Sequence, residues 1–381
     1  MERRSFLKVS VVGATAAAFG GAAWSGAFSA SAAPGDGPYG PLLPPDANGV
    51  ALPQGFTSRI VAKSLENVGD TGHRWHMAPD GGACFADGDG WIYCCNSEVP
   101  LIGGVGAIRF AADGSIVDAY TTLEHTDVNC SGGQTPWNTW LSCEEVDKGE
   151  VYETDPFGVN EAVVRPAMGR FKHEACAVDP DRQVVYMTED VGDGGFYRFT
   201  PTAWPDLSAG TLEIMVGPAD QTSGAVTWAQ VPDPSADDED TRDQVDGAKP
   251  FDGGEGCFYQ GGVCWFTTKG DNRVWAYDAA ASAINLTYDA DSPLSGVDNV
   301  TGTPGGDLFV AEDGDNMEIC IITPDGVVAP FVRVDGHEDS EITGPAFSPD
   351  GTRLYFSSQR GTGGGILDPG MTFEVTGPFR G

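Results

Sequence analysis

The sequence is poor in positive charge. It contains 21 lysine and arginine residues against 56 aspartate and glutamate residues, so its formal net charge is −35. A surface with such an excess of negative charge repels the phosphates of nucleic acids and the headgroups of anionic membranes. We therefore expect no nucleic-acid partner. The carboxylates suit divalent cations, although simple solvation of an exported protein accounts equally well for most of them.

Several common catalytic and metal-binding patterns are also missing. The chain has five histidines and no Cys-x-x-Cys pair or histidine-rich spacing of the kind that holds zinc. It has no Gly-x-Ser-x-Gly elbow and no phosphate-binding Gly-Lys-Ser/Thr loop. Helical periodicity is scarce, and no stretch after the N-terminal segment is long enough to span a bilayer. These absences disfavour serine hydrolases, P-loop enzymes and helical membrane proteins.

Residues 1–33 are predicted to be a twin-arginine signal peptide. Arg3 and Arg4 precede a mild apolar run, and small residues near position 32 offer a cleavage site. Glycine, serine and threonine interrupt the run, which disfavours a membrane anchor. This export route carries folded proteins, so its use indicates that the protein binds a cofactor before it is translocated. We expect the twin-arginine machinery as a partner, a monomer, and a periplasmic, cell-wall or extracellular location.

The rest of the chain is predicted to be an all-β protein. It contains 53 glycines and 26 prolines, and a repeat of two apolar strands joined by a turn, with polar residues after the second strand. Six four-stranded units predict a six-bladed β-propeller, whereas a two-domain sandwich explains the repeat less well. We expect an extended leader at 34–51, the propeller at 52–381 and a polar insertion at about 201–249. The repeats lie at 84–98, 133–145, 174–190, 255–269, 298–313 and 344–360.

A propeller brings equivalent positions of its repeats together around one channel. Glu174, Glu255 and Asp298 begin predicted innermost strands, and His76 is a further candidate for this ring. Crowded carboxylates repel one another unless cations neutralise them or their pKa values rise, so we predict a metal site. Oxygen ligands suit calcium or magnesium, whereas a thiolate favours a transition metal such as iron. A second set, at the ends of the following strands, contains Glu98, Cys143, Glu144, Glu189, Asp190, Glu312 and Asp313.

Each of these residues also has a plain structural interpretation. A single glutamate can cap a turn, and the Asp-Gly runs at 87–90 and 312–316 are hairpin turns rather than calcium loops. Most of the cysteines lie in apolar runs, where cysteine packs as a small hydrophobe. Cys143 differs because two carboxylates follow it directly. Lys269 and Arg360 are candidate anion contacts at strand ends, or simply surface residues.

Three motifs together resemble the PhoX-type alkaline phosphatase family over nearly the whole mature chain. They are the sequences at 135–145, 169–175 and 186–190. The resemblance implies a six-bladed propeller that hydrolyses phosphomonoesters at a cluster of iron and calcium. It also implies roles for individual residues. Cys143 would bridge the irons, Glu98, Glu174 and Glu255 would bind iron, and Glu144, Glu189, Asp190, Asp298 and Glu312 would bind calcium.

The chain departs from the family at one position that bears on activity. Family members carry Asp-Arg-Pro-Glu, with an arginine that contacts phosphate, where this chain has Asp252-Gly253-Gly254-Glu255. We predict an exported metal-dependent phosphoesterase acting on a small phosphorylated substrate, with Cys143, Lys269 and Arg360 as catalytic residues. A calcium-dependent lactonase-like propeller is one alternative, but it leaves Cys143 unexplained. A non-catalytic, metal-stabilised binding propeller is the other, and Gly253 favours it.

Overall fold

The computed structural model describes residues 32–290, 293–314, 316–365 and 367–380. Arg3, Arg4 and the apolar run of the predicted signal peptide lie outside the described residues. The described part is built almost entirely of strands, with one short 3-10 turn, η2 (Pro166–Met168). No helix in this part is long and apolar enough to cross a membrane.

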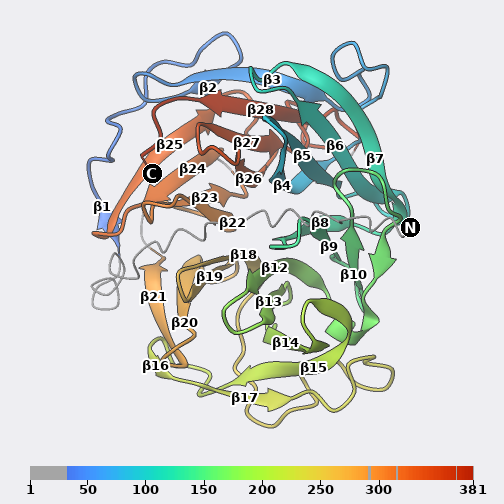
Figure 1. The fold of residues 1–381 in the computed structure, drawn as a ribbon. Coiled ribbons are helices and arrows are strands. Elements are labelled where there is room, and N and C mark those ends of the chain that lie inside the picture. Colours follow the sequence, from blue (N-terminus) through green and yellow to red (C-terminus); the bar gives the residue numbers. More distant parts are fainter. Residues whose placement is uncertain (1–31, 291–292, 315, 366, 381) are drawn as a thin grey trace, which may run out of the picture.

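The strands form six sheets arranged around a central axis, which confirms the predicted six-bladed propeller (Figure 1). Neighbouring strands within each blade are antiparallel, as tight turns between short strands require. The innermost strands contact one another in ring order, and the last contacts the first. Blade one contains β4 (Pro79–Asp87), β5 (Gly90–Ser97), β6 (Gly103–Phe110) and β7 (Ile116–Thr126), and blade two contains β8 (Asn129–Gln134), β9 (Trp140–Glu144), β10 (Val151–Thr154) and β11 (Val163–Val164). Blade three contains β12 (His173–Asp179), β13 (Val184–Glu189), β14 (Phe196–Ala203), β15 (Asp206–Val216) and β17 (Thr227–Gln230), and blade four contains β18 (Gly254–Gln260), β19 (Val263–Thr268), β20 (Arg273–Asp278), β21 (Ala283–Asp289) and β16 (Gly224–Ala225). Blade five contains β22 (Val297–Gly302), β23 (Leu308–Glu312), β24 (Glu318–Ile322) and β25 (Val327–Val334), and blade six contains β26 (Ile342–Phe347), β27 (Arg353–Ser358) and β28 (Met371–Thr376).

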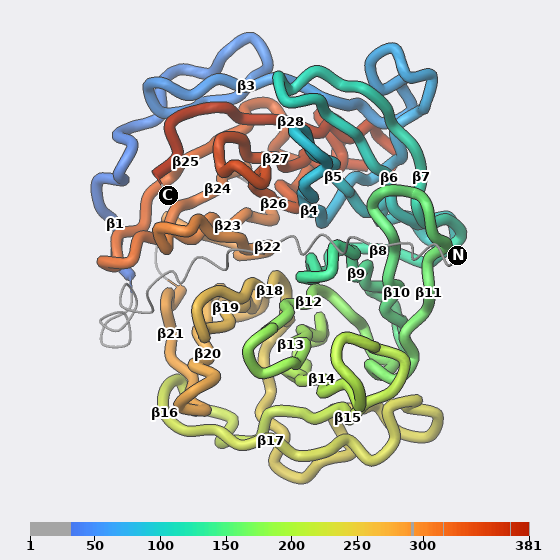
Figure 2. The backbone as a smooth tube through the Cα atoms, in the orientation of Figure 1, coloured from blue at the N-terminus to red at the C-terminus, as the bar shows by residue number. Residues whose placement is uncertain are grey.

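The ring is closed by a strand from the other end of the chain. β3 (Thr57–Lys63) pairs antiparallel with β28 and completes blade six, and Figure 2 shows this blue segment beside the red one. Two shorter strands, β1 (Ala33–Pro34) and β2 (Val50–Ala51), pair with β25 at the rim. The leader at 34–51, expected to hold no strand, therefore contributes to blade five. The range 201–249, expected to be a polar insertion, includes β15 and β17 of blade three and β16 of blade four.

The hydrophobic core lies between neighbouring blades. Successive side chains of a strand point to opposite faces, so each central strand packs against two blades. In blade five, Val310 packs toward blade four, whereas Phe309 packs toward blade six. Both side chains are fully buried. Truncating a buried phenylalanine such as Phe309 to alanine is expected to cost about 3–5 kcal/mol of stability.

Candidate metal centre

A β-bulge occurs at the same place in every innermost strand. In each blade the register between the first and second strands shifts by one residue, for example between Asn129 and Gly132. A bulge leaves residues outside the ladder and re-aims their side chains, which is why bulges are common beside active sites. Five of the six bulges begin with an acid or a thiol, and the sixth with glycine: Asp80, Cys130, Glu174, Glu255, Asp298 and Gly344.

A second ring of polar residues follows the second strand of each blade. Gln359 donates from its Nε2 to carboxylate oxygens of both Asp80 and Glu98, so it joins the two rings. The other members contact the first ring or one another through carboxylates and a lysine. The two rings therefore converge on one mouth of the channel. The second ring contains Glu98, Glu145, Asp190, Lys269, Asp313 and Gln359.

Ligand atoms within these rings lie close enough to share metal ions. One oxygen each from Glu174, Glu255 and Asp298 lies within 4.8 Å of the other two. At this mouth, two more groups of described residues meet the same limit, and one of them includes Asp298 again. These groups are Glu98, Cys130 and Glu145, and Asp298, Asp313 and Glu341.

Cys130 joins the groups on one side of the mouth. Its Sγ donates to Glu174 Oε1 at 3.3 Å, and both side chains are buried. The other oxygen of Glu174, Oε2, is buried and has no hydrogen-bond partner among the described residues. An orphaned carboxylate oxygen of this kind is costly unless a cation binds it. The donor set therefore fits a metal that accepts both sulfur and oxygen.

The mouth carries far more negative than positive groups. Burial, together with Glu145 and Glu341, raises the pKa of Glu98 to about 8. Burial and the neighbouring Asp313 raise the pKa of Glu341 to about 7. Without cations, such groups hold protons to relieve their repulsion. The cluster contains nine carboxyl groups, those of Asp80, Glu98, Glu145, Glu174, Asp190, Glu255, Asp298, Asp313 and Glu341.

Three basic side chains pair with this cluster in the part of the chain that the structure describes. Lys269 Nζ lies 3.0 Å from an oxygen of Glu255 and 3.3 Å from one of Asp313. Burial lowers the pKa of the Lys269 ammonium, but the neighbouring carboxylates outweigh burial and keep the lysine charged. The other two contacts are Arg360 to Glu341 at 2.8 Å and Lys172 to Asp190 and Glu145 at 2.7 and 2.9 Å. All three cations therefore neutralise part of the negative charge of the carboxylate cluster.

In blades two, three and five the second strand ends in an acid whose environment differs from that of the acid that follows it. Glu144 accepts hydrogen bonds from the backbone N–H groups of Asp127 and Glu150, at 2.9 and 3.1 Å. Glu189 accepts from Gly195 N and Tyr197 Oη and pairs with Arg242. These two predicted calcium ligands therefore make local contacts, and the same holds for Glu312, which accepts from Ser295 N at 2.6 Å.

Cys143 also lies away from the ligand groups. Its side chain is fully buried in the core between blades two and three, and its Sγ lies 3.4 Å from Cys176 Sγ. The thiol at the mouth is Cys130, which the sequence analysis did not consider. The signal for it in the sequence is the alignment of Cys130-Ser131 with Glu174-Ala175, whereas the predicted second repeat, 133–145, starts after Cys130. His76 stacks on Trp75 in blade one, with ring centroids 4.2 Å apart.

Gly253 adopts a backbone conformation that favours glycine. Its φ is +70°, in the left-handed region, and a Cβ here would lie 3.2 Å from Asp190 Oδ1. Its carbonyl accepts a hydrogen bond from Lys269 N at 2.8 Å, so Gly253 also fixes the start of the Lys269 turn. The position that carries an arginine in the family is therefore adapted to a residue without a side chain.

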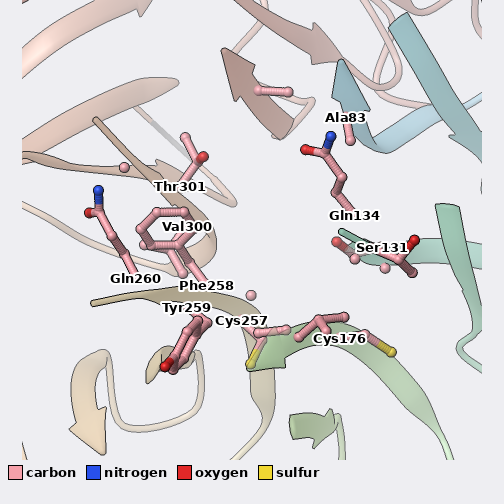
Figure 3. Close-up of a pocket in the computed structure, with 18 of the residues that line it drawn as sticks. Ala83, Ser131, Gln134, Cys176, Cys257, Phe258, Tyr259, Gln260, Val300 and Thr301 are labelled. Atoms are coloured by element: carbon pink, nitrogen blue, oxygen red, sulfur yellow. The ribbon is translucent and has the colours of Figure 1, made fainter. Parts of the chain in front are cut away.

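A large cavity lies at the other end of the innermost strands. It has a volume of about 630 Å³ and is lined by residues that follow the bulges in all six blades. Figure 3 shows Gln134, Gln260 and Thr301 around it, together with the sulfur atoms of Cys176 and Cys257. Of the described residues that line the cavity, only Asp181 is a carboxylate. The carboxylate side chains of the channel are therefore concentrated at the mouth on the bulge side.

Comparisons with known proteins bear on this geometry. The family model described as "Alkaline phosphatase PhoX" matches residues 96–289 and 274–361. The structure of Pseudomonas fluorescens PhoX in complex with vanadate, a transition state analogue, matches with a TM-score of 0.70 and 17% identity, over 88% of this chain and 97% of that chain. The gluconolactonase XC5397 from Xanthomonas campestris matches with a TM-score of 0.50 and 14% identity, over 90% and 99%. At these identities the structures establish the fold alone, and the search of curated proteins found no match.

Proposed function

The chain belongs to the alkaline phosphatase PhoX family, a family of hydrolases, and from this premise we propose that it hydrolyses phosphomonoesters with metal ions held at the bulge-side mouth of the channel. The observation that carries the proposal is the ring of bulge residues, because five of six equivalent positions supply a carboxylate or a thiol. The family resemblance noted in the sequence is confirmed by the family match.

The donor atoms divide the mouth into two kinds of metal site. The side with Cys130, Glu98 and Glu174 contains a thiol among carboxylates, which favours iron. The side with Asp298, Asp313 and Glu341 offers oxygen only, which favours calcium. When bound, such ions supply positive charge to the phosphoryl oxygens of a substrate. We assign the thiol-containing role to Cys130 instead of Cys143 because Cys130 contacts Glu174.

The basic residues of the mouth orient the substrate and stabilise its charge. Lys269 and Lys172 each bridge two carboxylates, so cations bound to those carboxylates compete with the ammonium groups. Ammonium groups released in this way are available to donate hydrogen bonds to a phosphate. Arg360 is placed to act in the same way beside Glu341. Together they replace the positive charge that glycine cannot supply at position 253.

Two alternatives explain fewer observations. A calcium-dependent lactonase-like propeller requires only oxygen ligands and leaves the contact between Cys130 and Glu174 without a role. A non-catalytic propeller is consistent with Gly253, but gives no role to the three cations around the carboxylate cluster. Turnover of a phosphomonoester separates the first proposal from both alternatives.

A pair of cysteine variants tests the proposal. In Cys130→Ser we expect kcat/KM for p-nitrophenyl phosphate to fall by about 100-fold or more, with loss of bound iron measured by plasma mass spectrometry. In the matched Cys143→Ser protein we expect iron content to be retained and kcat/KM to stay within about threefold, since Cys143 lies in the core. Iron loss in Cys143→Ser alone would contradict the assignment, and calcium without iron or turnover in the wild type would contradict the function.

We also propose that the protein is exported by the twin-arginine route after its metals are loaded. The support is the pair Arg3 and Arg4 before a mild apolar run. Replacing both arginines by lysine should leave the unprocessed protein inside the cell, as detected by fractionation. Normal export of the double variant would refute this part of the proposal.

A further inference from the structure

A second group of metal-ligand atoms lies inside blade five, separate from the channel mouth. Glu312 ends β23, and Glu318 and Cys320 lie two residues apart on the neighbouring strand β24. One ligand atom from each lies within 4.8 Å of the other two. All three side chains are buried, with exposed fractions of 0%, 6% and 0%. They lie on the face of blade five that packs against blade four, where Cys320 joins the core.

The arrangement is unfavourable as it stands. Ala311 pairs with Ile319, so Glu312 comes opposite Glu318 at the end of the ladder, and like charges directly opposite each other destabilise a sheet. Arg333, itself about 42% exposed, approaches an oxygen of Glu318 only to 3.7 Å. Oε2 of Glu312 is buried, and no hydrogen bond of ordinary geometry reaches it from the described residues. A bound cation would relieve each of these features.

The equivalent acids of two other blades show that this situation is specific to blade five. In blade two, both oxygens of Glu144 accept backbone N–H groups. In blade three, both oxygens of Glu189 have donors, and one of them is Arg242. In blade five, Oε1 of Glu312 accepts from Ser295 N, whereas Oε2 is buried without a hydrogen-bond partner among the described residues, and one oxygen of Glu312 lies within 4.8 Å of ligand atoms of Glu318 and Cys320. Glu144 and Glu189 occupy the equivalent position in other blades and therefore serve as controls for Glu312.

We propose that Glu312, Glu318 and Cys320 bind a divalent transition-metal ion of the zinc type at a structural site inside blade five. The Sγ of Cys320 lies 3.9 Å from Glu318 Oε2, so the thiol and both carboxylates converge on one point. Thiolate and carboxylate ligands together suit zinc-like ions better than calcium, which prefers oxygen alone. The fourth position falls to water or to Asn316, whose buried Oδ1 also has no hydrogen-bond partner among the described residues.

The ion would position a residue of the channel mouth. Asp313 follows Glu312 directly and contacts Lys269, Asp298 and Glu341. Binding of Glu312 to a metal on the blade side fixes the end of β23 and hence the direction of Asp313 on the channel side. This site does not depend on the proposed phosphatase activity, because its ligands and its face of the sheet are different.

Metal stoichiometry tests the proposal. Purified full-length mature protein, loaded with iron and calcium, is equilibrated with Zn²⁺, desalted and analysed by plasma mass spectrometry. We expect Glu312→Gln and Cys320→Ser to bind one equivalent of zinc per chain less than the wild type. The matched Glu144→Gln protein should bind as much zinc as the wild type. Equal zinc content in folded Glu312→Gln, Cys320→Ser and wild-type protein would overturn the proposal.

A spectroscopic measurement avoids dependence on variants of this site, which risk misfolding. X-ray absorption at the zinc edge is recorded on the Cys130→Ser protein, in which the channel thiol is absent but Cys320 remains. We expect a sulfur scatterer at about 2.3 Å from zinc. Zinc surrounded by oxygen alone in this protein would refute a site that contains Cys320.

Discussion

The two ends of the central channel are built from the same six strands and differ in chemistry. At the mouth where the strands begin, bulges carry residues such as Glu174, Glu255 and Asp298 close together. At the other end, the same strands surround a cavity of about 630 Å³ lined by neutral residues such as Gln134 and Gln260.

The difference shows where this fold tolerates an unfavourable charge distribution. The neutral end has one carboxylate among its described lining residues, so it needs no cation to offset repulsion between charges. Its Gln134 side chain donates from Nε2 to the carbonyl of Cys84 at 3.1 Å. The acidic mouth is stable only when protons or cations offset its repulsion. A cluster of buried carboxylates is therefore evidence for a ligand, whereas the size of a cavity alone is not.

The strongest test of this contrast removes one acid from the mouth. Glu174→Gln should lower kcat/KM for a phosphomonoester by about 100-fold to 1,000-fold, because an amide replaces a charged ligand in the middle of the cluster. Metal analysis should show that the variant binds less iron. Glu144→Gln is the matched control, since Glu144 bonds to two backbone N–H groups outside the cluster. Full activity in Glu174→Gln would mean that the mouth is not the reactive end.

A smaller effect is expected at the rim. Lys269→Met removes the ammonium that bridges Glu255 and Asp313, and we expect about a tenfold fall in kcat/KM. Lys63→Met, on the outer strand β3, serves as the control. Steady-state kinetics over a range of substrate concentrations separates an effect on KM from one on kcat. Unchanged kinetics in Lys269→Met would leave Lys172 and Arg360 as the only anion contacts of this mouth among the described residues.

Removing metal from the mouth should destabilise the protein. If ions are present at about 100 times their dissociation constant, binding contributes about 3 kcal/mol, and chelation should lower Tm by several degrees. Calorimetry with and without a chelator measures this shift. The shift should be smaller in Glu174→Gln, which has already lost a ligand. An identical shift in that variant would place the stabilising ion elsewhere.

The smallest effect is expected from adding charge to the neutral end. Gln134→Glu introduces a carboxylate beside the cavity and removes the donor to the Cys84 carbonyl, which should cost about 1 kcal/mol of stability. Activity should stay within about twofold, because no member of the mouth cluster is altered. Denaturant unfolding and kinetics on the same preparation check both values. A large loss of activity would show that the two ends are coupled.

The sequence alone determined the architecture and the kind of chemistry. Alternating apolar residues and tight turns, such as Asp-Gly, recur in six repeats and predict antiparallel blades, and the acids at equivalent strand positions indicated a metal site, including Glu174, Glu255 and Asp298. These patterns depend on local spacing, which the chain displays directly. The strand that closes the ring, β3, lies outside the repeats and was not foreseen.

Only the tertiary structure decided which individual side chains meet. Glu144 and Glu145, Glu189 and Asp190, and Glu312 and Asp313 are adjacent acids, and in each pair the second faces the channel. A shift of one residue in register moves each side chain to the opposite face of the strand. A bulge introduces such a shift, and no clear sequence pattern marks it. The choice between Cys130 and Cys143 depended on this shift, because the bulge aims Cys130 at Glu174 while regular pairing keeps Cys143 in the core.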